Sequence, residues 1–252
     1  MILYFTGTGN SEYVARALAD RLDDDVLSLN AVLRGDLIPH FTSRKPYVVV
    51  TPIHAWRIPQ VVSDLLPRLP FLGSDRIYFV ATMAGDAGGA ARGCRELAEK
   101  CGMHYMGFAT VRMPDNCVYL DRMPSKAEAR KIISRSTPDI ALLAQLIASS
   151  REFPHHRETP ATLLKSGNAM HAFYSRAIVS DRNYVVSSSC VGCSTCEGVC
   201  PIRNIHMVDG RPTFGGNCCA CYACIQHCPR EAIEIKGRSE GHGRYVCPTY
   251  QH

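Results

Sequence analysis

The chain has 252 residues, of which 46% are hydrophobic and 20% charged, an ordinary composition for a globular protein of one or two domains. The formal net charge of +5 is small and spread along the chain, so a nucleic-acid partner is not expected. No window approaches eighteen uninterrupted apolar residues, and the first residues lack the basic region and cleavage site of a secretory signal, so no membrane span is expected. Thirteen cysteines without such a signal predict a cytoplasmic protein whose cysteines bind metal or stay free.

A strand, a glycine-rich loop and a helix open the chain. Residues 1–5 form a short apolar run, and apolar residues recur at helical spacing over 13–22. The loop between them reads Thr6, Gly7, Thr8, Gly9, Asn10 and Ser11. Such an arrangement places a phosphate on exposed N–H groups at the N-terminus of a helix.

The loop sequence narrows the kind of phosphate. It lacks the G-K-[ST] ending of a nucleoside triphosphate loop. A dinucleotide fingerprint is disfavoured as well, because Glu12 stands where a third glycine is needed, and Asn30, after a second strand at 26–29, stands where an acidic residue is needed. Hydroxyls in place of a lysine suit a monophosphate, which points to FMN.

Two further loops are expected to complete this site. Strand-like runs at 47–50 and 76–81 lead into loops at 51–59 and 82–89, and helical patterns follow at 61–69 and 90–101. A fifth strand is predicted at 105–113. Alternating strands and helices predict a doubly wound, five-stranded parallel α/β sheet, in which ligands bind beyond the carboxyl ends of the strands.

The middle of the chain is predicted to be helical and then irregular. Residues 126–151 show helical spacing, which Pro138 is expected to divide into two helices, and Ser125 with Glu128 forms a capping box. The first domain is predicted to span residues 1–150, followed by a helical or irregular connector over 151–187. His155 and His156 within it are either a metal pair or part of an exposed loop.

Two cysteine runs near the end of the chain carry the strongest motif. Each follows the spacing C-x2-C-x2-C-x3-C-P, the pattern of bacterial two-cluster ferredoxins, in which the fourth cysteine of each run binds the other cluster. One [4Fe–4S] cluster is thus expected on Cys190, Cys193, Cys196 and Cys228. The other is expected on Cys218, Cys221, Cys224 and Cys200. The alternative is two zinc sites, but zinc sites usually pair two separate C-x2-C units.

Five cysteines lie outside these runs. Cys94 and Cys101 are expected to be small core residues on one face of a helix. Cys117, Cys219 and Cys247 are assigned no role, although Cys219 adjoins a predicted ligand and Cys247 precedes a proline as ligands do.

These motifs together resemble a known family. The TGTGNS loop resembles the phosphate loop of flavodoxins, and the loops PIHAW and TMAGDAGG resemble the two loops that enclose the flavin ring. Followed by the double cysteine run, they resemble the flavodoxin–ferredoxin fusion proteins of anaerobic bacteria and archaea. The resemblance implies a flavodoxin-like sheet of order 2-1-3-4-5, a small α+β two-cluster ferredoxin-like domain over 188–237 and a tail over 238–252.

The resemblance also implies the residues of the flavin site. Thr6 to Ser11 would hold the FMN phosphate. Two segments would enclose the ring, and their residues are Pro52, Ile53, His54, Ala55, Trp56, Thr82, Met83, Ala84, Gly85, Asp86, Ala87, Gly88 and Gly89. Trp56 either stacks on the ring or packs at a helix start, His54 is a proton donor or a spectator, and Asp86 binds the flavin or nucleates a turn.

Two functions fit these motifs. The first is electron transfer between FMN and two clusters, with external redox proteins as partners: a ferredoxin, a reductase or a hydrogenase-type protein. The second is an FMN-dependent reductase of a small molecule, fed by the clusters. A third possibility is a flavin-free domain that serves as a docking platform. Because no second dinucleotide motif is present, direct use of NAD(P)H is not expected.

Overall fold

A five-stranded parallel sheet forms the first part of the molecule. The computed structural model describes residues 1–39, 41–156, 167, 171–174 and 178–251. The sheet strands are β1 (Ile2–Tyr4), β2 (Val26–Ser28), β4 (Tyr47–Pro52), β6 (Arg76–Met83) and β7 (His104–Arg112), in the order β2-β1-β4-β6-β7. Counted along the chain within this sheet, the order is 2-1-3-4-5, with every neighbouring pair parallel. A separate parallel pair joins β3 (Phe41–Ser43) to β5 (Phe71–Gly73).

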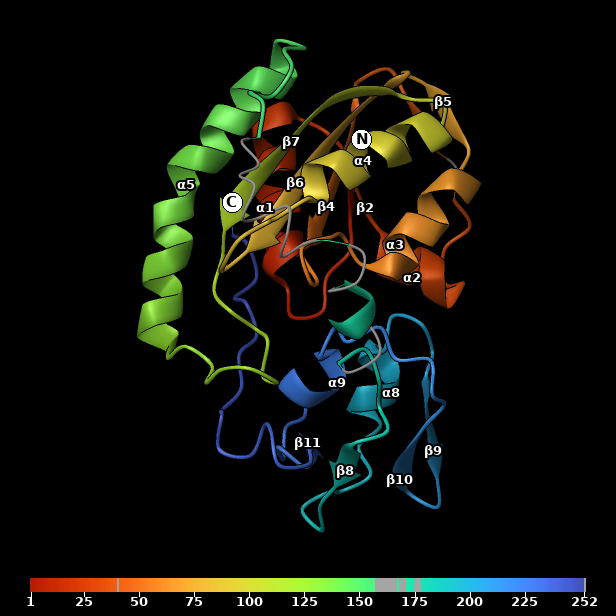
Figure 1. Ribbon diagram of the computed structural model, residues 1–252, viewed down its shortest axis with the longest axis vertical. Helices are drawn as coiled ribbons and strands as arrows, with labels where there is room; N and C mark the ends of the chain where they lie inside the picture. The colour runs from red at the N-terminus through yellow and green to blue at the C-terminus, as the bar shows by residue number, and fades with distance from the viewer. Residues whose placement is uncertain (40, 157–166, 168–170, 175–177, 252) are drawn as a thin grey trace.

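Helices cover both faces of this sheet (Figure 1). They are α1 (Asn10–Leu22), α2 (Leu29–Arg34), α3 (Gln60–Leu65) with the 3-10 turn η1 (Leu66–Arg68), α4 (Ala90–Lys100) and α5 (Lys126–Ala148). One buried cluster unites one face of the sheet with α1 and α5, and a second unites the other face with α3 and α4. This is a flavodoxin-like α/β arrangement, and it brings the loops after β1, β4 and β6 to one edge of the sheet.

Two predicted boundaries need correction. The second strand ends at Ser28, whose side chain accepts the N–H of Ala31 and so starts α2 at Leu29. The two helices expected around Pro138 are one helix, α5. Pro138 is exposed, so water can hydrogen-bond the carbonyl that loses its partner, while Ile133 and Ile140 on either side stay buried in the core.

The predicted capping box at the start of α5 is present. The Ser125 hydroxyl accepts the N–H of Glu128, and the Glu128 carboxylate accepts the N–H of Ser125 at 2.9 Å. We expect Ser125→Ala to lower the free energy of unfolding by about 1 kcal/mol, because these helix-end N–H groups lose their partners. Denaturant unfolding measures this change. The control is Ser134→Ala, at an exposed position inside the same helix. Equal stability of the two variants would contradict the assignment.

A smaller unit follows the connector and lies below the loop edge of the sheet (Figure 1). It contains two antiparallel pairs and two short helices. The pairs are β8 (Tyr184–Val186) with β11 (Ile233–Ile235), and β9 (Ile205–Val208) with β10 (Arg211–Phe214). The helices α8 (Thr195–Val199) and α9 (Ala223–Gln226) lie between the pairs and the first sheet. A third buried cluster, which includes Ile205, Ile225 and Ile233, forms its core.

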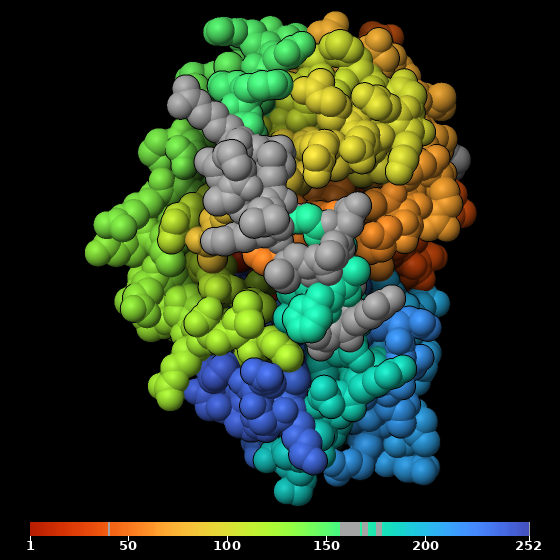
Figure 2. All heavy atoms as spheres, viewed as in Figure 1, coloured from red at the N-terminus to blue at the C-terminus, as the bar shows by residue number. Residues whose placement is uncertain are grey.

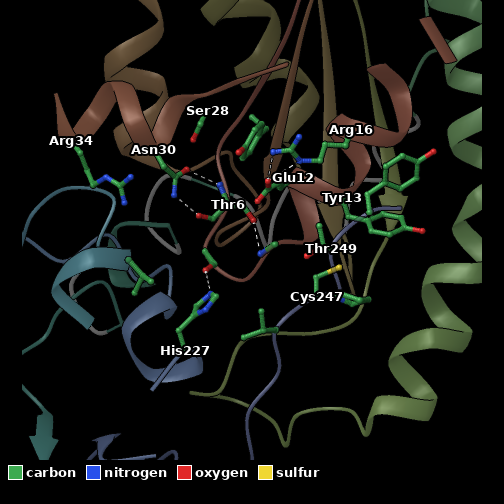
Figure 3. A pocket seen from close by; sticks show the side chains of 17 residues that line it. Thr6, Glu12, Tyr13, Arg16, Ser28, Asn30, Arg34, His227, Cys247 and Thr249 are labelled. Carbon is green, nitrogen blue, oxygen red and sulfur yellow. Dashed lines mark hydrogen bonds and ion pairs between the residues drawn. The ribbon is translucent and has the colours of Figure 1, made fainter. Parts of the chain in front are cut away.

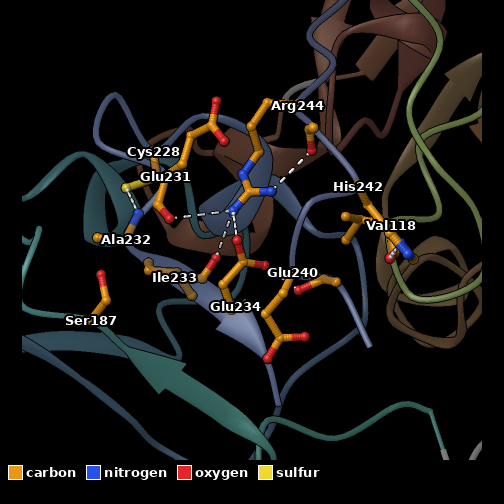
Figure 4. Close-up of polar contacts among 12 residues, drawn as sticks. Val118, Ser187, Cys228, Glu231, Ala232, Ile233, Glu234, Glu240, His242 and Arg244 are labelled. Atoms are coloured by element: carbon orange, nitrogen blue, oxygen red, sulfur yellow. Dashed lines mark hydrogen bonds and ion pairs between the residues drawn. The ribbon is translucent and has the colours of Figure 1, made fainter. Parts of the chain in front are cut away.

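The tail returns from this small unit to the first domain. Arg244 bonds the Glu234 carboxylate at 2.6 Å and the carbonyl of Ile233 at 3.1 Å, which fixes the tail beside β11 (Figure 4). The N–H of Tyr245 donates to the side chain of Gln226 in α9, and its buried hydroxyl donates to Asn10 at 2.7 Å. The tail therefore ties α9 to the start of α1. Among the described residues, no helix combines the length and apolar character needed to cross a membrane.

Candidate functional site

Hydrogen bonds to side chains of the loop itself and of Asn30 fix the conformation of the loop after β1. Asn30 accepts the N–H of Thr6 at 3.0 Å and donates to the carbonyl of Thr6 at 2.7 Å (Figure 3). The hydroxyl of Thr6 accepts the N–H of Gly9, which has φ 95° at the first turn of α1. Asn30, noted in the sequence only as the wrong residue for a dinucleotide, thus shapes the loop that precedes the helix N-terminus.

The loop after β4 makes a tight turn. His54 and Arg57 exchange two backbone hydrogen bonds, 2.8 and 3.1 Å long, and Ala55 and Trp56 between them have positive φ values of 46° and 64°. The Trp56 side chain packs on Gly88, where an added Cβ would lie 2.6 Å from the Cβ of Trp56. Trp56 therefore joins the two predicted ring loops to each other.

The loop after β6 contains an Asx turn. The Asp86 carboxylate accepts the N–H of Gly88 at 2.8 Å, so the turn role foreseen for Asp86 is present. Deeper in the site, the hydroxyls of Ser11 and Thr82 bond each other at 2.8 Å and connect the start of α1 to the end of β6. The three loops are consequently one connected structure.

The three loops enclose a pocket of about 410 Å³. Most residues expected to contact FMN line it: Thr6, Gly7, Asn10, Ser11, Pro52, Ile53, His54, Ala55, Trp56, Thr82, Met83, Ala84, Gly85 and Asp86. The other five expected residues do not line it: Thr8, Gly9, Ala87, Gly88 and Gly89. Thr8 is buried and accepts a hydrogen bond from Asn116, and Gly88 lies behind Trp56.

The two cysteine runs repeat one backbone conformation. Left-handed φ values recur at equivalent places: Gly192 and Ala220, Ser194 and Tyr222, Arg203 and Glu231. Alternating left- and right-handed residues turn successive N–H groups to one side and form concave sites for anions, including iron–sulfur clusters. The sulfurs of Cys200 and Cys228 accept equivalent bonds, from the N–H of Asn204 at 3.2 Å and of Ala232 at 3.3 Å (Figure 4 shows the second).

Each run borders a small cavity that also contains one cysteine of the other run. Cys190, Cys193, Cys196 and Cys228 line the first cavity. Cys218, Cys221, Cys224 and Cys200 line the second, together with Cys219. Within the described part of the chain, no three His, Cys, Asp or Glu side chains come close enough to hold a single metal ion. The eight cysteines are thus sorted around two cavities in the sets that the spacing predicted.

Comparison with known proteins gives matches among solved structures alone. No family model and no curated protein matches the chain. The two-electron reduced flavodoxin of Megasphaera elsdenii is 18% identical over 55% of this chain and 97% of that one, with a TM-score of 0.31. A flavodoxin from the domain Archaea is 13% identical over 57% and 96%, with a TM-score of 0.32. An FMN-dependent NADH-azoreductase from Bacillus anthracis, in complex with FMN, is 12% identical over 58% and 98%, with a TM-score of 0.38. TM-scores and sequence identities this low carry no information about function.

Several residues that line the pocket of the three loops were not expected from the sequence. The loop after β7 contributes Pro114, Asp115, Asn116, Cys117 and Leu120, the connector contributes Phe173, Tyr174 and Ile178, and the second cysteine run contributes Tyr222. The β7 loop could have been foreseen, because it follows a strand of the same sheet at the same edge. In Figure 2 the teal connector residues lie between the first domain and the blue small unit.

The cysteines outside the two runs, and the pair His155 and His156, can also be placed in the structure. Cys94 is fully buried in the core and Cys101 half-buried at the end of α4, as foreseen. Cys247 packs on the loop after β1, with its N–H donated to the Thr8 carbonyl at 2.8 Å. His156 lies edge-on to Phe108, and His155 is exposed. Burial raises the pKa of the Cys117 thiol to about 11, so it is protonated at neutral pH.

His54 is neutral at physiological pH, because burial lowers the pKa of its imidazole to about 4. The unfolded chain binds this proton near pH 6.5, so unfolding is favoured as the pH falls from about 6.5 towards 4. The free energy of unfolding of the unsubstituted protein should therefore fall as the pH is lowered, and His54→Asn should reduce that fall by on the order of 2 kcal/mol. His104→Asn, at an exposed position, should leave the fall unchanged. Unfolding free energies measured between pH 7 and 4.5 test this. Identical pH profiles for the His54 variant and the unsubstituted protein would contradict the assignment.

Proposed function

We propose that the protein transfers electrons between an FMN and two [4Fe–4S] clusters, and so couples low-potential one-electron redox proteins to a flavin. The observation that carries the proposal is the placement of the two four-cysteine cavities beneath the pocket formed by the three loops. The pocket that would hold a two-electron group and the two cavities that would hold one-electron groups lie in one chain.

The pocket suits FMN in its shape and its donors. The first turn of α1 presents N–H groups that have no partner within the helix, and the helix dipole favours a negative charge there. Thr6, Asn10 and Ser11 add neutral polar groups, as a monophosphate requires. At the other end, the loops after β4 and β6 present a largely apolar surface that suits a flat ring, with backbone amides that would tune the flavin's potential.

The cysteine cavities suit clusters better than zinc. Each is lined by three motif cysteines of one run and the fourth of the other, and the three come from a tight loop of repeated left-handed turns. N–H groups already point at ligand sulfurs, which is the interaction that adjusts a cluster's potential. Buried apolar residues such as Ile205, Ile225 and Ile233 exclude water around them.

When bound, flavin accepts an electron pair and clusters carry single electrons. The residues of this chain would bind and orient these groups. His54, neutral within its tight turn, carries no charge that would favour the anionic reduced ring at neutral pH. Leu120, Phe173 and Tyr174 line the pocket from outside the three loops. In an electron carrier these side chains would cover the ring, whereas a small-molecule reductase requires an open approach to it.

Reductive titration under anaerobic conditions tests the proposal. We expect the protein to take up about four electrons per chain, two at the flavin and one at each cluster, with bleaching of both flavin and cluster absorbance. Uptake of two electrons by the flavin alone would contradict it, as would clusters in a chain that binds no flavin. Rapid turnover with a small-molecule acceptor, faster than with any redox protein, would favour the reductase alternative.

A further inference from the structure

Tyr222 lies between the pocket formed by the three loops and one of the two cysteine cavities. It lines the pocket beside Asn116 and Cys117, and it also lines the cavity of Cys200, Cys218, Cys221 and Cys224. Its side chain is 4% exposed, and the Cys117 sulfur lies 3.9 Å from its hydroxyl. The cavity of Cys190, Cys193, Cys196 and Cys228 shares no described lining residue with the pocket.

The backbone at Tyr222 is unusual for so large a residue. Its φ is 57°, in the left-handed region that bulky side chains rarely adopt. At the equivalent position the other run has Ser194, which is exposed. The two runs share their backbone, so an aromatic side chain is present at this position only in the run that faces the pocket.

The main chain also brings that run against the loop after β1. An added Cβ on Gly7 would lie 2.1 Å from the carbonyl oxygen of Cys221, so the two backbones are in direct contact. In the other run, Cys193 is the exposed member of the eight predicted ligands, and Val191 is 63% exposed.

We propose that the two clusters act in a fixed order, with the Cys218 set as the inner cluster, joined to the flavin across Tyr222, and the Cys190 set as the outer cluster that meets the external redox protein. This rests on the proposed function. In the reducing direction, a one-electron donor protein is oxidised as it passes one electron to the outer cluster. The electron would then reach the inner cluster and a bound flavin. Two such passes with one proton from solvent would supply the electron pair that a flavin takes up.

Loss of one cluster at a time tests this order. Cys196→Ala and Cys224→Ala form a matched pair, because both residues are the third cysteine of their run, lie in short helices and are 8% exposed. Iron analysis first confirms that each variant keeps about half of the iron. Reduced methyl viologen is then mixed anaerobically with each variant, and the cluster and flavin absorbances are followed separately.

The order makes opposite predictions for the two variants. In Cys224→Ala the remaining cluster should bleach at the unsubstituted rate while the flavin stays oxidised. In Cys196→Ala the remaining cluster and the flavin should both bleach slowly. Flavin fluorescence, which does not depend on the donor, should rise on loss of the inner cluster and change little on loss of the outer one. The reverse pattern, or unsubstituted flavin bleaching in both variants, would overturn the order.

Tyr222 has its own test. With all cysteines present, Tyr222→Leu should lengthen the delay between cluster bleaching and flavin bleaching about tenfold or more. Tyr222→Phe should keep this delay within about threefold of the unsubstituted protein, because the aromatic ring is retained. Equal delays in the two variants at full iron and flavin content would remove Tyr222 from the path. If the unsubstituted protein binds no flavin or no iron, the proposed function itself fails. A reversed order with both groups bound leaves that function intact.

Discussion

If the protein binds FMN as proposed, Gly7→Ala is expected to cost it most of its flavin and to loosen the contact between its two parts. A Cβ at this position would lie 2.1 Å from the Cys221 carbonyl oxygen and 3.1 Å from its carbonyl carbon. Both are backbone atoms, so the clash cannot be relieved by a change of rotamer, and the loop after β1 or the cysteine loop must shift. We expect flavin affinity to fall about tenfold or more and the free energy of unfolding to drop by about 1–3 kcal/mol.

The flavin-to-protein ratio after gel filtration and denaturant unfolding measure the two effects. Gly93→Ala is the control, since its Cβ would meet nothing within 4 Å and alanine favours the helix interior of α4. A Gly7→Ala protein with the flavin content of the control would show that the loop after β1 does not hold the flavin.

A pair of double variants is expected to show which cysteines share a cluster. Cys200 is the fourth cysteine of the first run but lines the cavity of the second. If it binds there, Cys200→Ala with Cys218→Ala removes two ligands of one cluster and should leave about four irons per chain. Cys200→Ala with Cys190→Ala removes one ligand from each cluster and should leave almost none.

Iron and acid-labile sulfide analysis of anaerobically purified protein distinguishes these results. Cys94→Ala with Cys117→Ala, two cysteines outside the cavities, should retain about eight irons and controls for the loss of any two thiols. If each run bound its own cluster, the outcomes of the two Cys200 variants would be exchanged. That result would contradict the arrangement of the cavities.

The strands and their loops could be predicted from the sequence because local signals there agree with the fold. Apolar runs at 47–50 and 76–81 are buried in the sheet centre as β4 and β6, and each ends at a loop that lines the pocket. The expected grouping of Cys200 and Cys228, each with the other run, came from the motif itself, and each lines the cavity of the other run.

Other features depend on contacts between distant parts of the chain. Pro138 is tolerated inside α5 because the face opposite to it is packed on the sheet, which no local pattern reveals. Tyr222 reaches the pocket because the small unit docks on the loop after β1, and the hydrogen bond between Tyr245 and Asn10 joins residues at opposite ends of the chain. The connector residues Phe173 and Tyr174 gave no sequence signal that they line the pocket with the loops after β1, β4 and β6.

The most direct measurement is the content of flavin, iron, sulfide and zinc in protein purified without oxygen. We predict about one FMN, eight irons and eight sulfides per chain, with no stoichiometric zinc. Two zinc ions in place of iron, or eight irons in a chain without flavin, would contradict the account of this protein as a flavin joined to two clusters.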